Sequence, residues 1–279
     1  MTVRVELFSV WDVSGYDGAR NSTTTEWDFM YTADIMLHLD TTSNTKPTLE
    51  QKPYWNTRKP AFADVAAGFG ALLAGLAVSV VTAVSGMMMH PDSLGAVASF
   101  SQALGALTMF LLLWVVLRAR NWSKEDLGLL PLGSKGWHLL WEIPSMFVVS
   151  AIIVGSIRLL IPMEDAPNDT EAIAGSTSLW IVLALIITVV VGPFVEEIIF
   201  RRLLMGWLDH KTGRVVSTAL TCVIFALFHF SPATMIWVGC MGLFAALSVR
   251  WHNSIWAGYA IHLANNAVAS LVLVSALIG

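Results

Sequence analysis

Charged residues are scarce in this chain of 279 residues. They make up 13% of it, against about 25% in a typical soluble domain. Hydrophobic residues make up 56%, which argues against a globular protein with a solvated, charged surface. The net charge of −4 offers no basic surface, so we expect no nucleic-acid partner. The two cysteines, Cys222 and Cys240, lie in apolar runs without CxxC spacing, and we interpret them as small buried hydrophobic residues.

The first 60 residues differ in composition from the rest of the chain. They are rich in Thr, Ser, Asn, Asp and Lys, with scattered aromatics such as Trp27 and Trp55. We expect residues 1–60 to be a polar, largely disordered cytoplasmic extension. A small folded module is the alternative, although its core would be marginal at this size. The sequence then predicts a transmembrane domain over residues 61–279.

Apolar runs of membrane-spanning length recur from residue 61 to the end of the chain. They predict an all-α fold, a polytopic transmembrane bundle of about seven spans. The fifth and sixth runs are short, so these spans are interpreted as tilted, partly re-entrant or bounded at other residues. The expected spans are 63–89, 94–117, 137–161, 179–207, 213–230, 235–250 and 254–278.

Lys and Arg residues fall beside alternate connections between these spans. The connections in between contain none, and one of them is acidic. The positive-inside rule therefore predicts a cytoplasmic N-terminus and a C-terminus outside, in an integral membrane protein of the plasma membrane. The basic positions are Lys52, Arg58, Lys59, Arg118, Arg120, Lys124, Lys135, Arg201, Arg202, Lys211, Arg214 and Arg250.

Two adjacent carboxylates, Glu196 and Glu197, lie inside the fourth apolar run. An ionised carboxylate at the centre of a bilayer costs about 2.5–3.5 kcal/mol on insertion scales, so it usually persists for a function. Residues four apart share a helix face, which predicts an ion pair between Glu197 and Arg201. Glu196 points about 100° away and is left for chemistry. Pro193 can kink the helix here.

Two later apolar runs carry polar residues that could complete a hydrolytic site. The fifth ends in His229, and the seventh contains His262 and Asn266 at helical spacing. Glu196 would act as a general base on water, and the amide of Asn266 supplies N–H donors for a developing oxyanion. Each histidine or asparagine alone could instead be a helix–helix hydrogen-bond partner, and we expect Asn265 to pack or to support the seventh span and not to catalyse.

The depths of these residues conflict in the simplest topology. Glu196 and His262 are expected nearer the cytoplasmic side, whereas His229 lies about 16 residues into its span, roughly 24 Å along a helix. They can meet only if the fifth span is tilted, begins later or dips into a cavity, or if the site lies near mid-membrane. Glu142, near the cytoplasmic start of the third span, is expected to reach the lipid headgroups.

Three strings carry a resemblance to a known family: GPFVEEIIFRR, FALFH and SIWAGYAIHLANN. In order and spacing they are similar to the motifs of the CAAX-protease and bacteriocin-processing family, also called CPBP or Abi. The resemblance covers about residues 179–270. One departure is Arg202, where family members usually have Gly, and this arginine could alter packing or anchor to headgroups.

The resemblance implies an all-helical intramembrane endopeptidase acting on lipidated or membrane-associated proteins and peptides. Glu196 with His229 would activate water, His262 with Asn266 would bind the oxyanion, and Glu197 and Arg201 would support the site. It implies no required cofactor as first choice. Zinc is the alternative, since Glu196, His229 and His262 together make a plausible ligand set. Eukaryotic members cleave prenylated CaaX proteins, and bacterial ones are linked to bacteriocin maturation and immunity.

A different class of function stays open beside the protease. A non-catalytic immunity or scaffold protein could bind a peptide in the same cavity, but it would be free to lose part of the polar set, and no member of the set is missing. A transporter could also use buried carboxylates, yet the sequence shows no paired halves or internal repeat.

Overall fold

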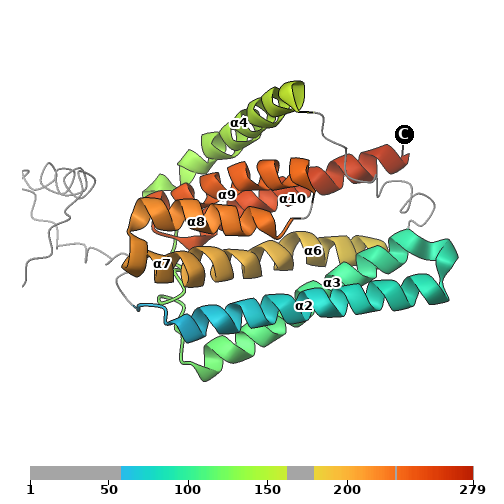
Figure 1. Ribbon diagram of the computed structural model, residues 1–279, viewed down its shortest axis with the longest axis horizontal. Helices are drawn as coiled ribbons and strands as arrows, with labels where there is room; N and C mark the ends of the chain where they lie inside the picture. The colour runs from blue at the N-terminus through green and yellow to red at the C-terminus, as the bar shows by residue number, and fades with distance from the viewer. Residues whose placement is uncertain (1–57, 162–178, 230, 279) are drawn as a thin grey trace, which may run out of the picture. The chain divides into compact units, whose positions relative to one another are not determined.

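Helices form nearly all of the chain that the structure describes, which is residues 58–161, 179–229 and 231–278 of a computed structural model (Figure 1). The predicted extension over residues 1–60 lies outside the described residues, except for its last three. Two short 3-10 turns, η2 (Pro91–Ser93) and η3 (Gly133–His138), precede α3 and α4. The other elements are α2 (Phe62–Met89), α3 (Leu94–Ala119), α4 (Leu139–Leu160), α6 (Leu179–Glu197), η4 (Ile198–Leu204), α7 (Met205–Thr212), α8 (Arg214–Leu227), α9 (Pro232–His252) and α10 (Ile255–Ile278).

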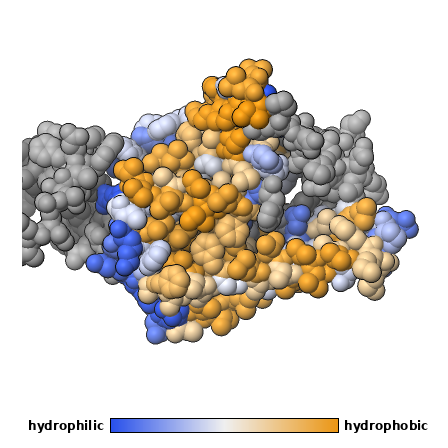
Figure 2. Space-filling model, in the orientation of Figure 1, coloured by the Kyte–Doolittle hydropathy of each residue, from blue (hydrophilic) through white to orange (hydrophobic). Residues whose placement is uncertain are grey.

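The prediction of an all-α bundle is confirmed, and a helical segment corresponds to each of the seven predicted spans. The segments α6, η4 and α7 follow one another without a break and correspond to the predicted fourth span. Within the described residues, α2, α3, α4 and α9 are each long and apolar enough to cross a membrane, whereas α8 is apolar but shorter. Helices suit this setting because they satisfy every backbone hydrogen bond internally. Figure 2 shows hydrophobic residues over most of the visible face, with hydrophilic ones toward its ends.

A close approach of two backbones fixes how α2 packs against α3. A Cβ atom added to Gly75 would lie 2.6 Å from the carbonyl oxygen of Gly105. One added to Gly105 would lie 2.7 Å from the carbonyl oxygen of Gly75. Between lipid-facing helices, association depends on van der Waals packing, and small residues let the backbones come near enough for it. The two glycines are therefore the contact point of this helix pair.

The segment formed by α6, η4 and α7 is the centre of the bundle. It has contacts with α2, α3, α8 and α10, and Figure 1 shows α6 between α8 and α2. Its middle part, η4, is a π-helical turn, and all seven of its residues are buried. The ring of Phe200 in η4 packs edge-on against Phe69 at 5.5 Å and Phe225 at 5.0 Å between centroids. Such wide turns within α-helices occur frequently at functional sites.

A tight turn at Gly213 explains how His229 reaches the depth of Glu196. Gly213 has a φ of 79°, in the left-handed region that glycine adopts without strain, and it joins α7 directly to α8. Glu196 precedes this turn, and His229 follows it, by about 16 residues each, so the two lie at similar distances from it. The fifth span was predicted over 213–230, but α8 ends at Leu227. Its 14 residues extend about 21 Å, less than a bilayer core, and the depth conflict is thereby removed.

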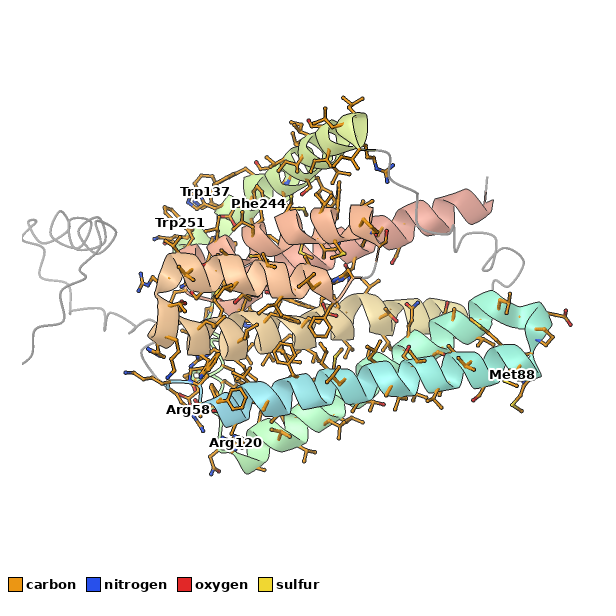
Figure 3. All side chains as sticks on the ribbon, in the orientation of Figure 1. Arg58, Met88, Arg120, Trp137, Phe244 and Trp251 are labelled. Carbon is orange, nitrogen blue, oxygen red and sulfur yellow. The ribbon has the colours of Figure 1, made fainter. Side chains whose placement is uncertain are left out.

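Polar contacts tie the start of α2 to the end of α3. The carboxylate of Asp64 accepts hydrogen bonds from Arg120 Nε at 2.5 Å and Trp122 Nε1 at 3.0 Å. The guanidinium of Arg58 lies 4.4 Å over the Trp122 ring and donates to the carbonyl of Arg120 at 3.0 Å. Figure 3 shows Arg58 and Arg120 together at one end, far from Met88. We call the end that contains Arg58 and Arg120 the basic end.

We predict that Gly75→Val destabilises the protein, because the new side chain cannot fit between the backbones of α2 and α3. Overpacking of this kind typically costs about 1–3 kcal/mol. The measurement is thermal unfolding in detergent, with yield from membranes as a second readout. Gly70→Val is the matched control, since a Cβ on Gly70 meets nothing within 4 Å. Equal unfolding midpoints for the two variants would contradict the prediction.

Candidate active site

The two adjacent glutamates lie where α6 passes into η4, and their surroundings differ sharply. The side chain of Glu197 is fully buried, with 0% exposed. That of Glu196 retains 24% exposure. Adjacent residues of a helix point about 100° apart, so one carboxylate enters the packed interior and the other does not. Among the described residues, Glu196 accepts no hydrogen bond.

The predicted ion pair between Glu197 and Arg201 is present. Arg201 Nη1 lies 3.2 Å from Glu197 Oε1, and the arginine side chain is 1% exposed. The same guanidinium donates from Nη2 to the carbonyl of Gly242 at 3.3 Å and lies 4.4 Å over the Phe225 ring. Two opposite charges are therefore buried together, with a backbone acceptor from α9 and an aromatic face from α8. Removal of one partner from such a pair typically costs about 3–5 kcal/mol.

His262 on α10 links the two carboxylates. Its Nδ1 lies 3.0 Å from Glu197 Oε1, a hydrogen-bond distance. Its Nε2 lies 3.7 Å from Glu196 Oε2, which is too long for a hydrogen bond. A carboxylate accepts only, so Nδ1 must carry the proton that it shares with Glu197. The ring is then held in one orientation, with Nε2 directed toward Glu196.

Phe225 on α8 brings the second histidine beside the first. Its ring centroid is 5.5 Å from that of His262, edge-on, and 5.2 Å from that of His229. His229 follows the end of α8, and its Nδ1 lies 3.1 Å from the carbonyl oxygen of Phe225. That carbonyl can only accept, so this Nδ1 also carries a proton and leaves Nε2 as the available nitrogen. No hydrogen bond or ion pair joins His229 to Glu196 within the described part of the chain.

Two glycines make this packing possible, and the sequence patterns did not single them out. A Cβ on Gly258 would lie 2.5 Å from Glu197 Oε2 and 2.6 Å from Val249 Cγ2. A Cβ on Gly242 would lie 3.1 Å from Phe225 and 3.2 Å from Arg201 Nη2. The sequence could have indicated them, because a glycine inside an apolar helix usually marks a place where a neighbouring helix packs closely against its backbone.

Asn266 accepts a hydrogen bond from its neighbour Asn265 and, among the described residues, forms none with His262. Trp237 Nε1 on α9 donates to Asn265 Oδ1 at 2.8 Å, and Asn265 Nδ2 donates to Asn266 Oδ1 at 3.1 Å. All three side chains are partly buried. Asn265 was expected to pack or to support the seventh span, and these bonds join its side chain to α9 and to Asn266.

The proposed zinc ligands do not come together as a set. Glu196 and His262 approach each other, but no group of three His, Cys, Asp or Glu side chains in the described chain could hold a metal ion. His262 also directs Nδ1 to Glu197. The residues present therefore do not form a three-ligand metal site in this conformation.

Arg202, the departure from the family motif, is buried and packs against the basic end. Its guanidinium donates to the carbonyls of Asp126 and Arg58 and lies 5.0 Å over the Trp122 ring. With 0% of the residue exposed, it does not extend to the headgroups. It binds the connection after α3 to the central helix.

Glu142 is a second buried carboxylate, and the expectation that it reaches the headgroups is wrong. It is 7% exposed and accepts a hydrogen bond from Ser248 Oγ at 2.5 Å. Its other oxygen lies 2.9 Å from His252 Nε2. The cluster joins α4 to α9 near the basic end, where a buried charge needs such partners.

Comparisons with known proteins agree with the three motifs. Residues 178–268 match the family described as Type II CAAX prenyl endopeptidase Rce1-like. A protein of Bacillus subtilis (strain 168) named "Putative membrane peptidase YdiL" is 29% identical over 182 residues, which cover 64% of this chain and 71% of that protein. No solved structure matches. The resemblance is therefore confirmed over the segment that contains all six predicted site residues.

We predict that Gly258→Ala disturbs the site more than the fold. The added methyl group would collide with Glu197 Oε2, so this carboxylate must move away from His262 or Arg201. Helix propensity favours the alanine by about 1 kcal/mol, which opposes any general destabilisation. We expect at least a tenfold loss of cleavage with much of the yield retained. Gly239→Ala is the control, because its Cβ would meet only Ala226 at 3.6 Å.

Proposed function

We propose that this chain is an intramembrane endopeptidase in which Glu196 activates water to hydrolyse a peptide bond. The family match and the relative support a membrane protease, but they do not specify its mechanism. The proposed role of Glu196 rests on the difference between the two adjacent carboxylates. Glu197 is buried and bound by Arg201 and His262, whereas Glu196 is partly exposed and free to bind water.

The proposed reaction begins with Glu196 as general base. Its carboxylate takes a proton from water while the water oxygen forms a bond to the peptide carbonyl carbon, and the carbonyl electrons move to oxygen. When the tetrahedral intermediate collapses, the carbon–nitrogen bond breaks and Glu196 returns the proton to the leaving amine. One water is consumed and the carboxylate is regenerated. A positioned group of this kind typically contributes about 10²–10⁴-fold.

We assign the developing oxyanion to His262 and Asn266 on one face of α10. In its charged form His262 donates from both nitrogens, so Nδ1 can hold Glu197 while Nε2 donates to the oxyanion. Asn266 would add its amide N–H groups. Loss of one such donor costs about 10²–10³-fold in turnover in other hydrolases. His229, the other imidazole beside Phe225, would orient the water for Glu196.

The proposed substrate is a lipidated or membrane-associated protein or peptide. The exposed side chains of the described helices are largely apolar, so membrane lipid surrounds the bundle and a lipidated chain could approach through it. The family description names prenyl endopeptidases, which supports a lipid-modified substrate as one class. We propose that water enters from the basic end, which the distribution of Lys and Arg assigns to the cytoplasm.

We predict that Glu196→Gln abolishes cleavage without loss of folding. The amide keeps the size of the side chain but cannot remove a proton from water. The change breaks no hydrogen bond among the described residues, since His262 Nε2 lies 3.7 Å from Glu196 Oε2. The measurement is a comparison of protein termini in the membranes of cells that express the wild type or the variant. Purified wild type and variant are then tested on a peptide that spans the cleavage site found.

The control variants separate catalysis from support and from binding. Glu197→Gln leaves Arg201 buried without its counter-ion, so we expect a lower unfolding temperature together with lower activity. Glu125→Gln changes an exposed residue and should alter neither. If the chain is a non-catalytic immunity or scaffold protein, Glu196→Gln will complement a deletion strain and no termini will depend on the wild type. Either result would contradict the proposal.

We further predict that hydrolysis needs no metal ion. Purified protein treated with a strong chelator, and shown by elemental analysis to contain no zinc, is expected to cleave the same peptide at an unchanged rate. Loss of activity on chelation that returns when zinc alone is added would overturn this prediction. It would require His229 to move toward Glu196 and His262.

A further inference from the structure

A chain of three side chains joins α9 to the end of the proposed oxyanion site. The indole of Trp237 donates to Asn265 Oδ1 at 2.8 Å, and Asn265 Nδ2 donates to Asn266 Oδ1 at 3.1 Å. Asn266 lies one helical turn beyond His262 on the same face of α10. Among the described residues, no acceptor is bonded to the amide nitrogen of Asn266.

The direction of this chain of bonds is set by the tryptophan. An indole N–H can donate but cannot accept. Asn265 must therefore turn its oxygen toward Trp237, which leaves its NH2 group for Asn266. Asn266 must in turn direct its oxygen at Asn265, so its own NH2 group points away from both. Because the indole N–H of Trp237 can only donate, it fixes the orientation of both amides. Without it, each amide could adopt two orientations.

Packing holds the tryptophan in place. The ring of Trp237 lies 6.2 Å from that of Phe147 on α4, with the rings tilted by 51°. The residues beside the contact are also buried: Met146 on α4 is 0% exposed and Val238 on α9 is 4% exposed. Trp237 is therefore held by two helices that contribute none of the proposed reacting groups.

We infer that Trp237 and Asn265 are positioning residues that orient the amide of Asn266 so that it donates to the oxyanion. The inference rests on the proposed function and extends it to two residues that the sequence did not place in the catalytic set. If both amides were reversed, the oxygen of Asn266 would face the oxyanion and repel it. The bonds from Trp237 prevent that arrangement.

The sharpest test compares two substitutions of the same residue. Asn265→Ala removes the bond to Asn266, so both orientations of Asn266 are populated and kcat should fall about two- to tenfold. Asn265→Asp still accepts from Trp237 but offers Asn266 only an acceptor. Asn266 must then donate to the aspartate and direct its oxygen at the oxyanion. We expect Asn265→Asp to lose at least tenfold more kcat than Asn265→Ala, with KM little changed.

A second test introduces no charge and serves if the aspartate variant fails to fold. Trp237→Phe keeps the ring against Phe147 and removes the donor, so kcat should fall about as much as in Asn265→Ala. The double variant should be no slower than Asn265→Ala, because both changes break the same chain of bonds. Trp114→Phe, at a tryptophan on α3 that is 49% exposed, is the control and should leave kcat unchanged.

The assay is cleavage, in detergent micelles, of the peptide that spans the identified cleavage site. Asn266→Ala is measured in parallel and should lose about 10²-fold or more in kcat. If Asn266→Ala is as active as the wild type, the role of Asn266 fails and the inference fails with it. If Asn266→Ala is inactive but Trp237→Phe has wild-type kcat, or the two losses multiply in the double variant, only the inference is overturned. Asn265→Asp no slower than Asn265→Ala would also overturn it.

Discussion

Ionised groups inside a hydrocarbon layer persist only when other groups solvate them, and this requirement organises the core of the bundle. The carboxylate of Glu197 and the guanidinium of Arg201 are 0% and 1% exposed, and they meet at 3.2 Å. To support that pair, α10 supplies His262, α9 supplies the Gly242 carbonyl and α8 supplies an aromatic face. Four helical segments therefore converge at this ion pair, because the two buried charges need polar and aromatic partners there.

The same convergence separates two carboxylates that are adjacent in the sequence. Glu197 is bound on two sides, and the ring of His262 that binds it also directs its second nitrogen at Glu196. Glycine at position 258 leaves the space that this arrangement needs. Glu196, the carboxylate suited to proton transfer, thus lies beside Glu197, whose carboxylate is bound by Arg201 and His262. This arrangement fits the proposed division in which Glu196 reacts and Glu197 supports the site.

Hydropathy and helical spacing were enough to predict the helical bundle and the ion pair at the candidate site. Apolar runs gave the seven helical segments, and the four-residue spacing gave the ion pair of Glu197 with Arg201. The bounds of the fifth span stayed open, because an apolar run does not show where a helix stops, and α8 ends at Leu227. Contacts between distant helices were missed. Glu142 meets His252 across 110 positions and Trp237 meets Asn265 across 28, and such pairs depend on helix rotation and crossing, which a single sequence does not encode locally.

The π-helical turn η4 has a consequence for how this segment can diverge over time. It places seven residues, with more residues per turn than an α-helix, between the glutamates and α7, and the turn at Gly213 follows within ten positions. One residue more or fewer anywhere in that stretch would rotate everything on one side of it by about 100° relative to the other. A substitution there changes one side chain, whereas an insertion or deletion changes the orientation of a whole helical segment. Among descendants of this protein, we expect the segment to keep its number of residues.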